Sequence, residues 1–195
     1  MNNEMDSTNQ SQRILKAAFK CISLKGYANV SLRNIADEAE VALSQLNYYY
    51  KNKEGLFIKV VKILTEKYLH EIEDSLKKGK SQNENISNLI DYFEKMVKNT
   101  PELFKLLFDL TSMALWSASL KKLINNLFNS LIGLIEKYII NNFSSREKLK
   151  DCSSRALSKM IFSTIFGTSI QAMLANEEEK EGIVDSLSAL KIFFK

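Results

Sequence analysis

Residues 31–54, SLRNIADEAEVALSQLNYYYKNKE, contain two short helical patterns separated by only a few residues. Ser31 is a favoured N-cap residue, and the apolar residues after it fall at the three-and-four spacing of one buried helix face. That face comprises Leu32, Ile35, Ala36 and Ala39. The second pattern runs from about Ala42 to Tyr50 and ends in three consecutive tyrosines. Two short helices joined this tightly predict a helix-turn-helix unit.

A third helical pattern precedes this unit and supplies an apolar face that would cover it. The pattern extends over residues 13–27, and Gly26 stands where a left-handed residue would end the helix. Three helices of this length form only a small core, which needs support from the helices that follow. We therefore expect an N-terminal three-helix domain over residues 1–53, with a disordered leader of about residues 1–8.

Positive charge is concentrated in the same stretch of sequence. Between Ser11 and Lys53, seven Lys or Arg residues and three acidic residues give a net charge of +4, which equals the net charge of the whole chain. The remaining residues therefore balance to zero. A basic region at one end of a molecule attracts the phosphates of a nucleic acid.

The second helix of the unit presents a set of outward-facing residues that form the predicted reading surface. They are Leu43, Ser44, Gln45, Asn47 and Tyr48. Gln45 suits adenine and Leu43 suits a thymine methyl group, whereas Arg33 is the nearest candidate for guanine because no Lys or Arg lies between residues 42 and 50. The sequence thus predicts a DNA site with a preference for A·T base pairs.

Two further residues are better suited to hold the DNA backbone than to read bases. Tyr48 and Lys53 lie where they would contact phosphates and set the register of the protein on the duplex. The alternatives stay open: consecutive tyrosines on a helix often form core plus a solvated rim, and Arg33 and Lys53 can be solvated charges.

From Glu54 onwards the chain has the pattern of helices only. Pro101, the single proline, suits the first turn of a helix, and no segment alternates with a period of two residues. The expected helices cover residues 54–78, 86–98, 101–115, 120–142, 148–175 and 180–193. The predicted fold is therefore all-α, with a second, C-terminal helical domain over residues 54–195.

Residues 160–175, MIFSTIFGTSIQAMLA, carry no charge, so a helix there must be covered on every side. One side can pack within its own domain, and the other predicts a homodimer, which also suits a helix-turn-helix protein that reads two half-sites. The predicted interface residues are Met160, Ser163, Thr164, Gly167, Thr168, Ile183, Leu187 and Leu190. The alternative is a core helix buried within a monomer.

Other classes of protein find little support in the composition. One His and no Gly-rich phosphate loop argue against an enzyme, and Cys21 and Cys152 lie far apart without a partner motif, so we expect neither a metal site, a disulfide nor a cofactor. We find no signal peptide and no span apolar enough for a bilayer, which favours a cytoplasmic protein.

The motifs between Arg13 and about Val61 resemble, in their order, the N-terminal domain of the tetracycline-repressor (TetR) family of bacterial transcriptional regulators. The matching positions are Ile14, Leu15, Ala17, Ala18, Gly26, Tyr27, Ile35, Ala36, Leu46 to Tyr50, Lys51, Lys53, Glu54 and Leu56. The resemblance implies that Ser31, Arg33, Leu43, Ser44, Gln45, Asn47, Tyr48 and Lys53 approach double-stranded DNA.

Three positions depart from the usual pattern of this family. Glu40 stands where Gly is usual, Ala42 replaces a capping Ser, and Asn47 replaces a common phosphate-contacting Tyr. The turn and the start of the reading helix are therefore the places where DNA binding can differ from that of other members.

Proteins of this family enclose a small, mostly apolar effector in the C-terminal domain. The corresponding large and adaptable side chains here are Tyr92, Phe93, Met96, Phe104, Leu107, Phe108, Met113 and Trp116, which suit an ordinary core equally well. The resemblance implies a repressor that its effector releases from the operator. The alternative is an all-helical interaction module that oligomerises without specific DNA binding.

Overall fold

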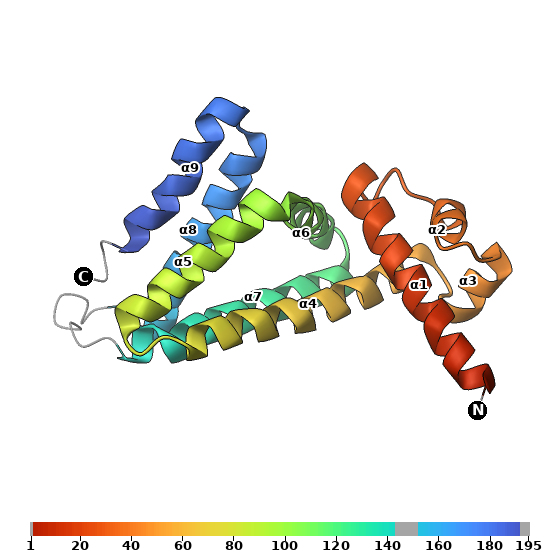
Figure 1. Ribbon diagram of the computed structural model, residues 1–195, viewed down its shortest axis with the longest axis horizontal. Helices are drawn as coiled ribbons and strands as arrows, with labels where there is room; N and C mark the ends of the chain where they lie inside the picture. The colour runs from red at the N-terminus through yellow and green to blue at the C-terminus, as the bar shows by residue number, and fades with distance from the viewer. Residues whose placement is uncertain (1, 143–151, 192–195) are drawn as a thin grey trace. The chain divides into compact units, whose positions relative to one another are not determined.

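The computed structural model describes residues 2–142 and 152–191, and all regular structure within these ranges is helical (Figure 1). The prediction of an all-α fold is confirmed. The described chain divides into two compact units, one formed by residues up to 66 together with 105–123, and the other by residues 67–104 together with 124 onwards. No helix of the described residues is both long enough and apolar enough to cross a membrane.

The first unit is built on three N-terminal helices: α1 (Asn2–Lys25), α2 (Leu32–Glu38) and α3 (Leu43–Tyr49). The side chains that hold them together are buried almost completely; they are Ile14, Ala18, Ile22, Ile35 and Leu46. Gly26 follows α1 with a φ of 76°, which confirms the predicted left-handed stop. Because α1 begins at Asn2, it includes the segment for which the sequence predicts a disordered leader.

Three longer helices contribute residues to both units. They are α4 (Lys53–Lys77), α6 (Pro101–Ala114) and α7 (Ala118–Tyr138). The predicted domain boundary at residue 53 coincides with the start of α4, whereas the compact units divide α4 after Glu66. The first turns of α4 therefore pack with the N-terminal helices, as the small predicted core requires.

The second unit contains α5 (Gln82–Asn99), α8 (Ser154–Leu174), α9 (Glu177–Ala189) and a short 3₁₀ helix (Ile140–Asn142). Helix α8 packs against α9 and α5. Its core includes Leu89, Ile90, Phe93, Ile161 and Ile165, each less than a tenth exposed. At its edge, Lys191 Nζ donates a 2.8 Å hydrogen bond to Asp91 Oδ1, and Ser188 Oγ donates one of 3.0 Å to Glu94 Oε1.

Serine caps set two of the helix starts that differ from the sequence-based prediction. Helix α5 begins four residues earlier than expected, since Ser81 Oγ accepts a hydrogen bond from the N–H of Glu84. Helix α8 begins at Ser154 because Ser153 caps it in the same way. The earlier part of the helix predicted from residue 148, and the end of the one predicted to reach 193, lie outside the described residues.

Candidate nucleic-acid interface

The start of α2 is fixed by a reciprocal cap. Ser31 Oγ accepts a 3.1 Å hydrogen bond from the N–H of Asn34, while Asn34 Oδ1 accepts one of 2.9 Å from the N–H of Ser31. This pair satisfies two backbone donors that a helix start otherwise leaves open. Ser31 therefore sets the direction of α2, and its exposed position still permits the DNA contact that the sequence predicts.

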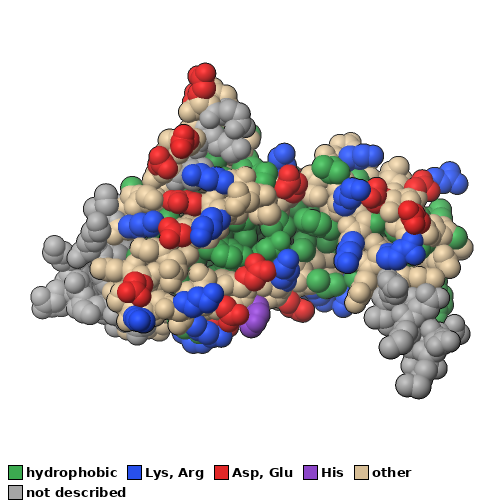
Figure 2. Space-filling model, in the orientation of Figure 1, with side chains coloured by type: hydrophobic (Ala, Val, Ile, Leu, Met, Phe, Trp, Pro, Cys, Tyr) green, Lys and Arg blue, Asp and Glu red, His purple; other side chains and the backbone are tan. Residues whose placement is uncertain are grey.

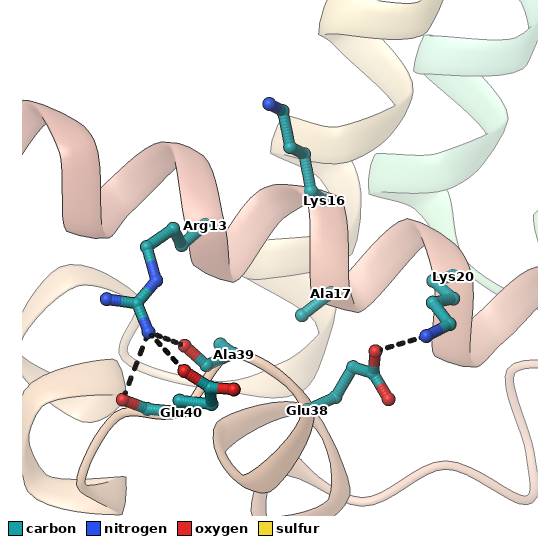
Figure 3. Close-up of a pocket in the computed structure, with 7 residues that line it drawn as sticks. All are labelled: Arg13, Lys16, Ala17, Lys20, Glu38, Ala39 and Glu40. Atoms are coloured by element: carbon teal, nitrogen blue, oxygen red, sulfur yellow. Dashed lines mark hydrogen bonds and ion pairs between the residues drawn. The ribbon is translucent and has the colours of Figure 1, made fainter.

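The turn between α2 and α3 passes through a left-handed residue that is not glycine. Glu40 has a φ of 53°, a conformation that costs an ordinary residue about 1–2 kcal/mol. Arg13 compensates for it: one guanidinium nitrogen donates to the carbonyl oxygen of Ala39 at 2.7 Å and to that of Glu40 at 3.3 Å (Figure 3). The same nitrogen lies 3.4 Å from Glu40 Oε2. The turn thus keeps the left-handed form that glycine would adopt.

An open hollow of about 300 Å³ lies between α1 and the end of α2, lined by Arg13, Lys16, Ala17, Lys20, Glu38, Ala39 and Glu40. Lys20 Nζ pairs with Glu38 Oε1 at 2.5 Å, and this hydrogen bond raises the pKa of Lys20. Lys16 points away from Arg13 and Lys20, each of which is paired with a glutamate (Figure 3). Lys, Arg and acidic side chains are interspersed over the visible face of this unit, so its positive charge is partly neutralised locally (Figure 2).

Helix α3 lacks a capping side chain at its first position. Ala42 is the N-cap residue, and its backbone N–H instead donates a 3.1 Å hydrogen bond to Gln45 Oε1. Leu46 is fully buried and anchors the helix from its inner side. Gln45, which the sequence assigns to base reading, therefore makes one half of a capping box, and the half that a serine hydroxyl at position 42 would make is missing.

The predicted reading surface is accessible as a group. Ser44, Gln45 and Asn47 are exposed, Leu43 is half-buried, and the side chain of Tyr48 is 84% exposed. The exposed guanidinium residue Arg33 belongs to the outer side of α2. None of these side chains is buried in the core of the first unit. Their exposure is what a DNA contact needs, and the contact itself stays a prediction.

Tyr49 and Tyr50 have a different role from Tyr48. Both are half-buried, and Tyr50 Oη lies 3.0 Å from Ser11 Oγ, whereas Tyr49 Oη donates a 3.4 Å hydrogen bond to Gln10 Oε1. These contacts connect the end of α3 to the first half of α1. The tyrosine triplet therefore divides into two half-buried side chains that bond to α1 and the exposed Tyr48, whose ring meets that of Tyr49 edge to face at 5.4 Å.

Lys53 is engaged within the protein. Its Nζ donates a hydrogen bond to the carbonyl oxygen of Tyr27 and lies 4.1 Å from the centre of the Tyr27 ring. Burial lowers the pKa of Lys53, and the carboxylate of Asp109 acts in the opposite direction. The ring of Tyr27 packs in turn on Phe57, with centroids 4.6 Å apart. Lys53 thus holds the junction of α1 and α4, and a phosphate contact would compete with this role.

Two polar side chains that the sequence pattern does not reveal attach the N-terminal helices to residues much later in the chain. Asp109 on α6 accepts a 2.6 Å hydrogen bond from the N–H of Tyr27. Glu54, at the start of α4, accepts one of 3.1 Å from Ser117 and another from Ser119. These bonds lower the pKa of Glu54. A single acid within a helical pattern carries no local signal for such a partner.

The candidate effector residues occupy different environments. Phe93 and Phe104 are buried with ring centroids 6.3 Å apart. Tyr92 Oη donates a 2.9 Å hydrogen bond to Glu71, and burial together with this bond raises the pKa of Tyr92. Four others are half-buried: Met96, Leu107, Phe108 and Met113. Trp116, by contrast, is 90% exposed.

The candidate dimer residues are also divided between surface and core. Met160, Ser163 and Thr164 are exposed on α8, and a Cβ at half-buried Gly167 would meet no atom within 4 Å. Two are buried within the chain itself, Thr168 at 8% and Leu187 at 0% exposure. The remaining two, Ile183 and Leu190, are half-buried. The accessible part of the predicted interface is therefore the outer face of α8.

Comparison with known proteins agrees with this geometry. Residues 14–60 match the family model "Bacterial regulatory proteins, tetR family". The fatty acid metabolism regulator protein of Bacillus subtilis is 22% identical over 182 residues, which cover 92% of this chain and 91% of that protein.

Solved structures share the fold over nearly the whole length. A TetR transcription regulator from Haloarcula marismortui has a TM-score of 0.80 at 21% identity, and the match covers 96% of this chain and 98% of that regulator. The transcriptional regulator FadR from Bacillus subtilis, in complex with stearoyl-CoA, has a TM-score of 0.68 at 19% identity, covering 90% and 96%. Residues 14–60 thus match the tetR family of bacterial regulatory proteins, and the chain shares the fold of solved regulators over nearly its whole length.

Proposed function

We propose that this protein is a homodimeric repressor that leaves its operator when a long-chain fatty acyl-CoA binds to it. One observation carries the choice of effector: a regulator of fatty acid metabolism is similar to this chain over 92% of its length. A related fold holds stearoyl-CoA. The family resemblance implies a small, apolar effector, and long-chain acyl-CoA is one chemical class of such effectors.

The side chains of the second unit suit an acyl chain. Helix α5 carries Tyr92, Phe93 and Met96 in succession along one side, and Phe104 follows at the start of α6. Aromatic and Met side chains adapt to a flexible apolar ligand, and apolar burial supplies most of the binding energy of such a ligand. The half-buried positions of Tyr92 and Met96 leave them able to repack around it.

The route from effector to DNA lies in helices that belong to both units. Asp109 on α6 contacts Tyr27 after α1, and the start of α7 contacts Glu54 through Ser117 and Ser119. A shift of α6 or α7 along its axis would therefore act on the N-terminal helices through hydrogen bonds without involving a base contact. The effector must bind the two conformations with different affinity for this shift to occur.

A dimer is required for specific recognition. One helix-turn-helix unit contacts one half-site, and a twofold pair reads two half-sites at a spacing set by the protein. The exposed residues Met160, Ser163 and Thr164 of α8, none of which carries a charge, support this assembly. In a monomer the apolar side chain of Met160, which is 63% exposed, would remain in water beside these two hydroxyl side chains.

The experiment is a titration of the protein–DNA complex. A fluorescent duplex, selected from a random library by binding to the full chain, is titrated with the protein, and anisotropy gives the Kd. Stearoyl-CoA and palmitoyl-CoA, below their micellar concentrations, should raise the Kd at least about tenfold, while coenzyme A alone should leave it unchanged. Free stearate separates recognition of the acyl chain from recognition of the thioester.

The outcomes separate the parts of the proposal. An unchanged Kd with both acyl-CoA compounds would exclude this effector class, and a lower Kd would exclude release as the mechanism. Equal effects of stearate and stearoyl-CoA would assign the specificity to the acyl chain alone. None of these results alters the match to the tetR family, which does not depend on the effector.

A further inference from the structure

The start of α3 restricts how one side chain of the reading helix can approach DNA. Ala42, at the N-cap, has no side-chain oxygen, and its backbone N–H donates a 3.1 Å hydrogen bond to Gln45 Oε1. A backbone N–H requires an acceptor, and only the oxygen of a carboxamide accepts. The orientation of the Gln45 amide is therefore fixed by the bond: its oxygen faces the helix start, and its NH₂ group is left for another partner.

A glutamine that reads adenine uses both ends of its carboxamide. The oxygen accepts from the adenine N6 amino group while the NH₂ donates to N7. At Gln45, Oε1 already accepts a hydrogen bond from the N–H of Ala42, so the N6 amino group of adenine would have to reach the second lone pair of an oxygen that is held towards the helix start. The adenine contact that the sequence predicts therefore competes with the cap of the helix that carries it.

We propose that Gln45 reads the major groove through its NH₂ group alone and selects a base that presents only acceptors there, guanine or thymine. Guanine offers N7 and O6 side by side, and thymine offers O4. Cytosine presents a donor, and adenine places its N6 amino group beside N7, so that two donors would meet. The inference rests on DNA binding, which the match to the tetR family supports, and is independent of the proposed effector.

The same helix contains a matched amide without this restriction. Asn47 is exposed, and its carboxamide has no hydrogen-bond partner among the described residues. Asn47 can therefore offer both an acceptor and a donor, as adenine requires. Within one reading helix, the structure thus distinguishes a donor-only amide from an unrestricted one.

The test is selection of binding sites from a duplex library with a randomised core, using the full-length wild-type protein and four variants. Gln45→Ala identifies the base positions that Gln45 reads, and Asn47→Ala identifies those of the control amide. Gln45→Glu retains an oxygen for the Ala42 N–H and replaces the NH₂ donor by a second acceptor. Ala42→Pro removes the competing N–H at a residue whose φ of −66° suits proline.

The proposal predicts a defined set of preferences. Wild-type sites should carry guanine or thymine at the position that loses selection in Gln45→Ala, with a preference of roughly tenfold. Gln45→Glu should move that preference to cytosine, whose amino group donates. Ala42→Pro should add adenine, because the freed oxygen completes the two-ended contact. Far-UV circular dichroism establishes that each variant is folded. If Ala42→Pro does not fold, the preference of Gln45→Glu alone tests the proposal.

Three results would overturn the proposal. Adenine at the wild-type position would show that the amide gives up its cap to read both adenine groups. An unchanged preference in Gln45→Glu would show that the NH₂ group is not the reader. The absence of any position that depends on Gln45, while Asn47→Ala still alters selection, would show that Gln45 serves only the helix start.

Discussion

The carboxylate of Asp109 on α6 accepts a 2.6 Å hydrogen bond from the backbone N–H of Tyr27, 82 residues earlier in the chain. Gly26, with its φ of 76°, ends α1 and turns this N–H away from the helix. A Cβ at Gly26 would lie 3.4 Å from the same carboxylate oxygen, which is close to an ordinary contact, so the positive φ is what favours glycine here. One acidic side chain therefore ties the end of α1 to α6.

Replacing Asp109 with alanine should destabilise the first unit. The Tyr27 N–H would lose a charge-assisted hydrogen bond in a partly buried site, a loss of about 1–3 kcal/mol. Urea unfolding followed by circular dichroism measures the change. Asp185→Ala, at an exposed position of α9, is the control and should change the unfolding free energy by less than about 0.5 kcal/mol. Equal changes in unfolding free energy for the two substitutions would show that the Asp109 hydrogen bond does not stabilise the first unit.

Glu40→Gly should stabilise the protein. Removing the side chain from a left-handed residue should raise the unfolding free energy by about 1–2 kcal/mol. The greater freedom of glycine in the unfolded chain offsets about 0.5–1 kcal/mol of this gain. The ion pair that is lost, 3.4 Å from Arg13 and exposed, contributes little. Asp37→Gly, one turn earlier in regular helix, should instead destabilise. A lower urea midpoint for Glu40→Gly would mean that the carboxylate matters more than the backbone.

The local parts of this fold could be predicted from the sequence, whereas contacts between distant segments could not. The helix-turn-helix pattern and the stop at Gly26 depend on neighbouring residues, so periodicity and residue type reveal them. The bonds from Asp109 to Tyr27 and from Ser117 to Glu54 join residues more than sixty positions apart. Polar residues within helices give no sign of which distant backbone or side chain they meet.

Residue type alone also left the exposure of particular side chains open. Its large aromatic side chain places Trp116 among the candidate effector residues, but Trp116 follows the end of α6 and lies in solvent. The sequence gives no sign of the bond from Ala42 to Gln45, because the usual signature of such a cap begins with Ser or Thr and Ala42 has no hydroxyl group. Both cases required the backbone positions of the helix ends.

Tyr48→Ala should weaken DNA binding without loss of stability. Its side chain is 84% exposed, so truncation should change the unfolding free energy by less than about 0.5 kcal/mol. If it contacts a phosphate, the Kd for all duplexes should rise by a similar factor, roughly tenfold, whatever their sequence. Tyr50→Ala is the contrasting variant, because its ring is half-buried and its hydroxyl meets Ser11. Unchanged affinity in Tyr48→Ala would assign Tyr48 to the solvated rim.

The stability of the protein should fall in acid partly through Glu54. Hydrogen bonds from Ser119 and Ser117 lower its pKa below the ordinary value of 4.5. A lowered pKa stabilises the folded state above the ordinary value, and this contribution is lost as the pH falls through the folded pKa. Urea unfolding between pH 3 and 7 should therefore show a weaker acid loss for Glu54→Gln and for Ser119→Ala. Parallel curves for all three proteins would contradict this role.

Ser163→Lys should dissociate the proposed dimer. Ser163 and Thr164 are exposed on α8, between Met160 and the open space beside Gly167, so a lysine there would place two like charges in a twofold interface. Thr168 is unsuitable for this test because it is buried within the chain, and a charge there would disturb folding. Sedimentation velocity should show a monomer for Ser163→Lys and a dimer for Asn126→Lys, an exposed control on α7. The monomer should also bind a two-half-site duplex less tightly, since each unit would then contact one half-site alone. A dimer that persists in Ser163→Lys would place the interface on another surface.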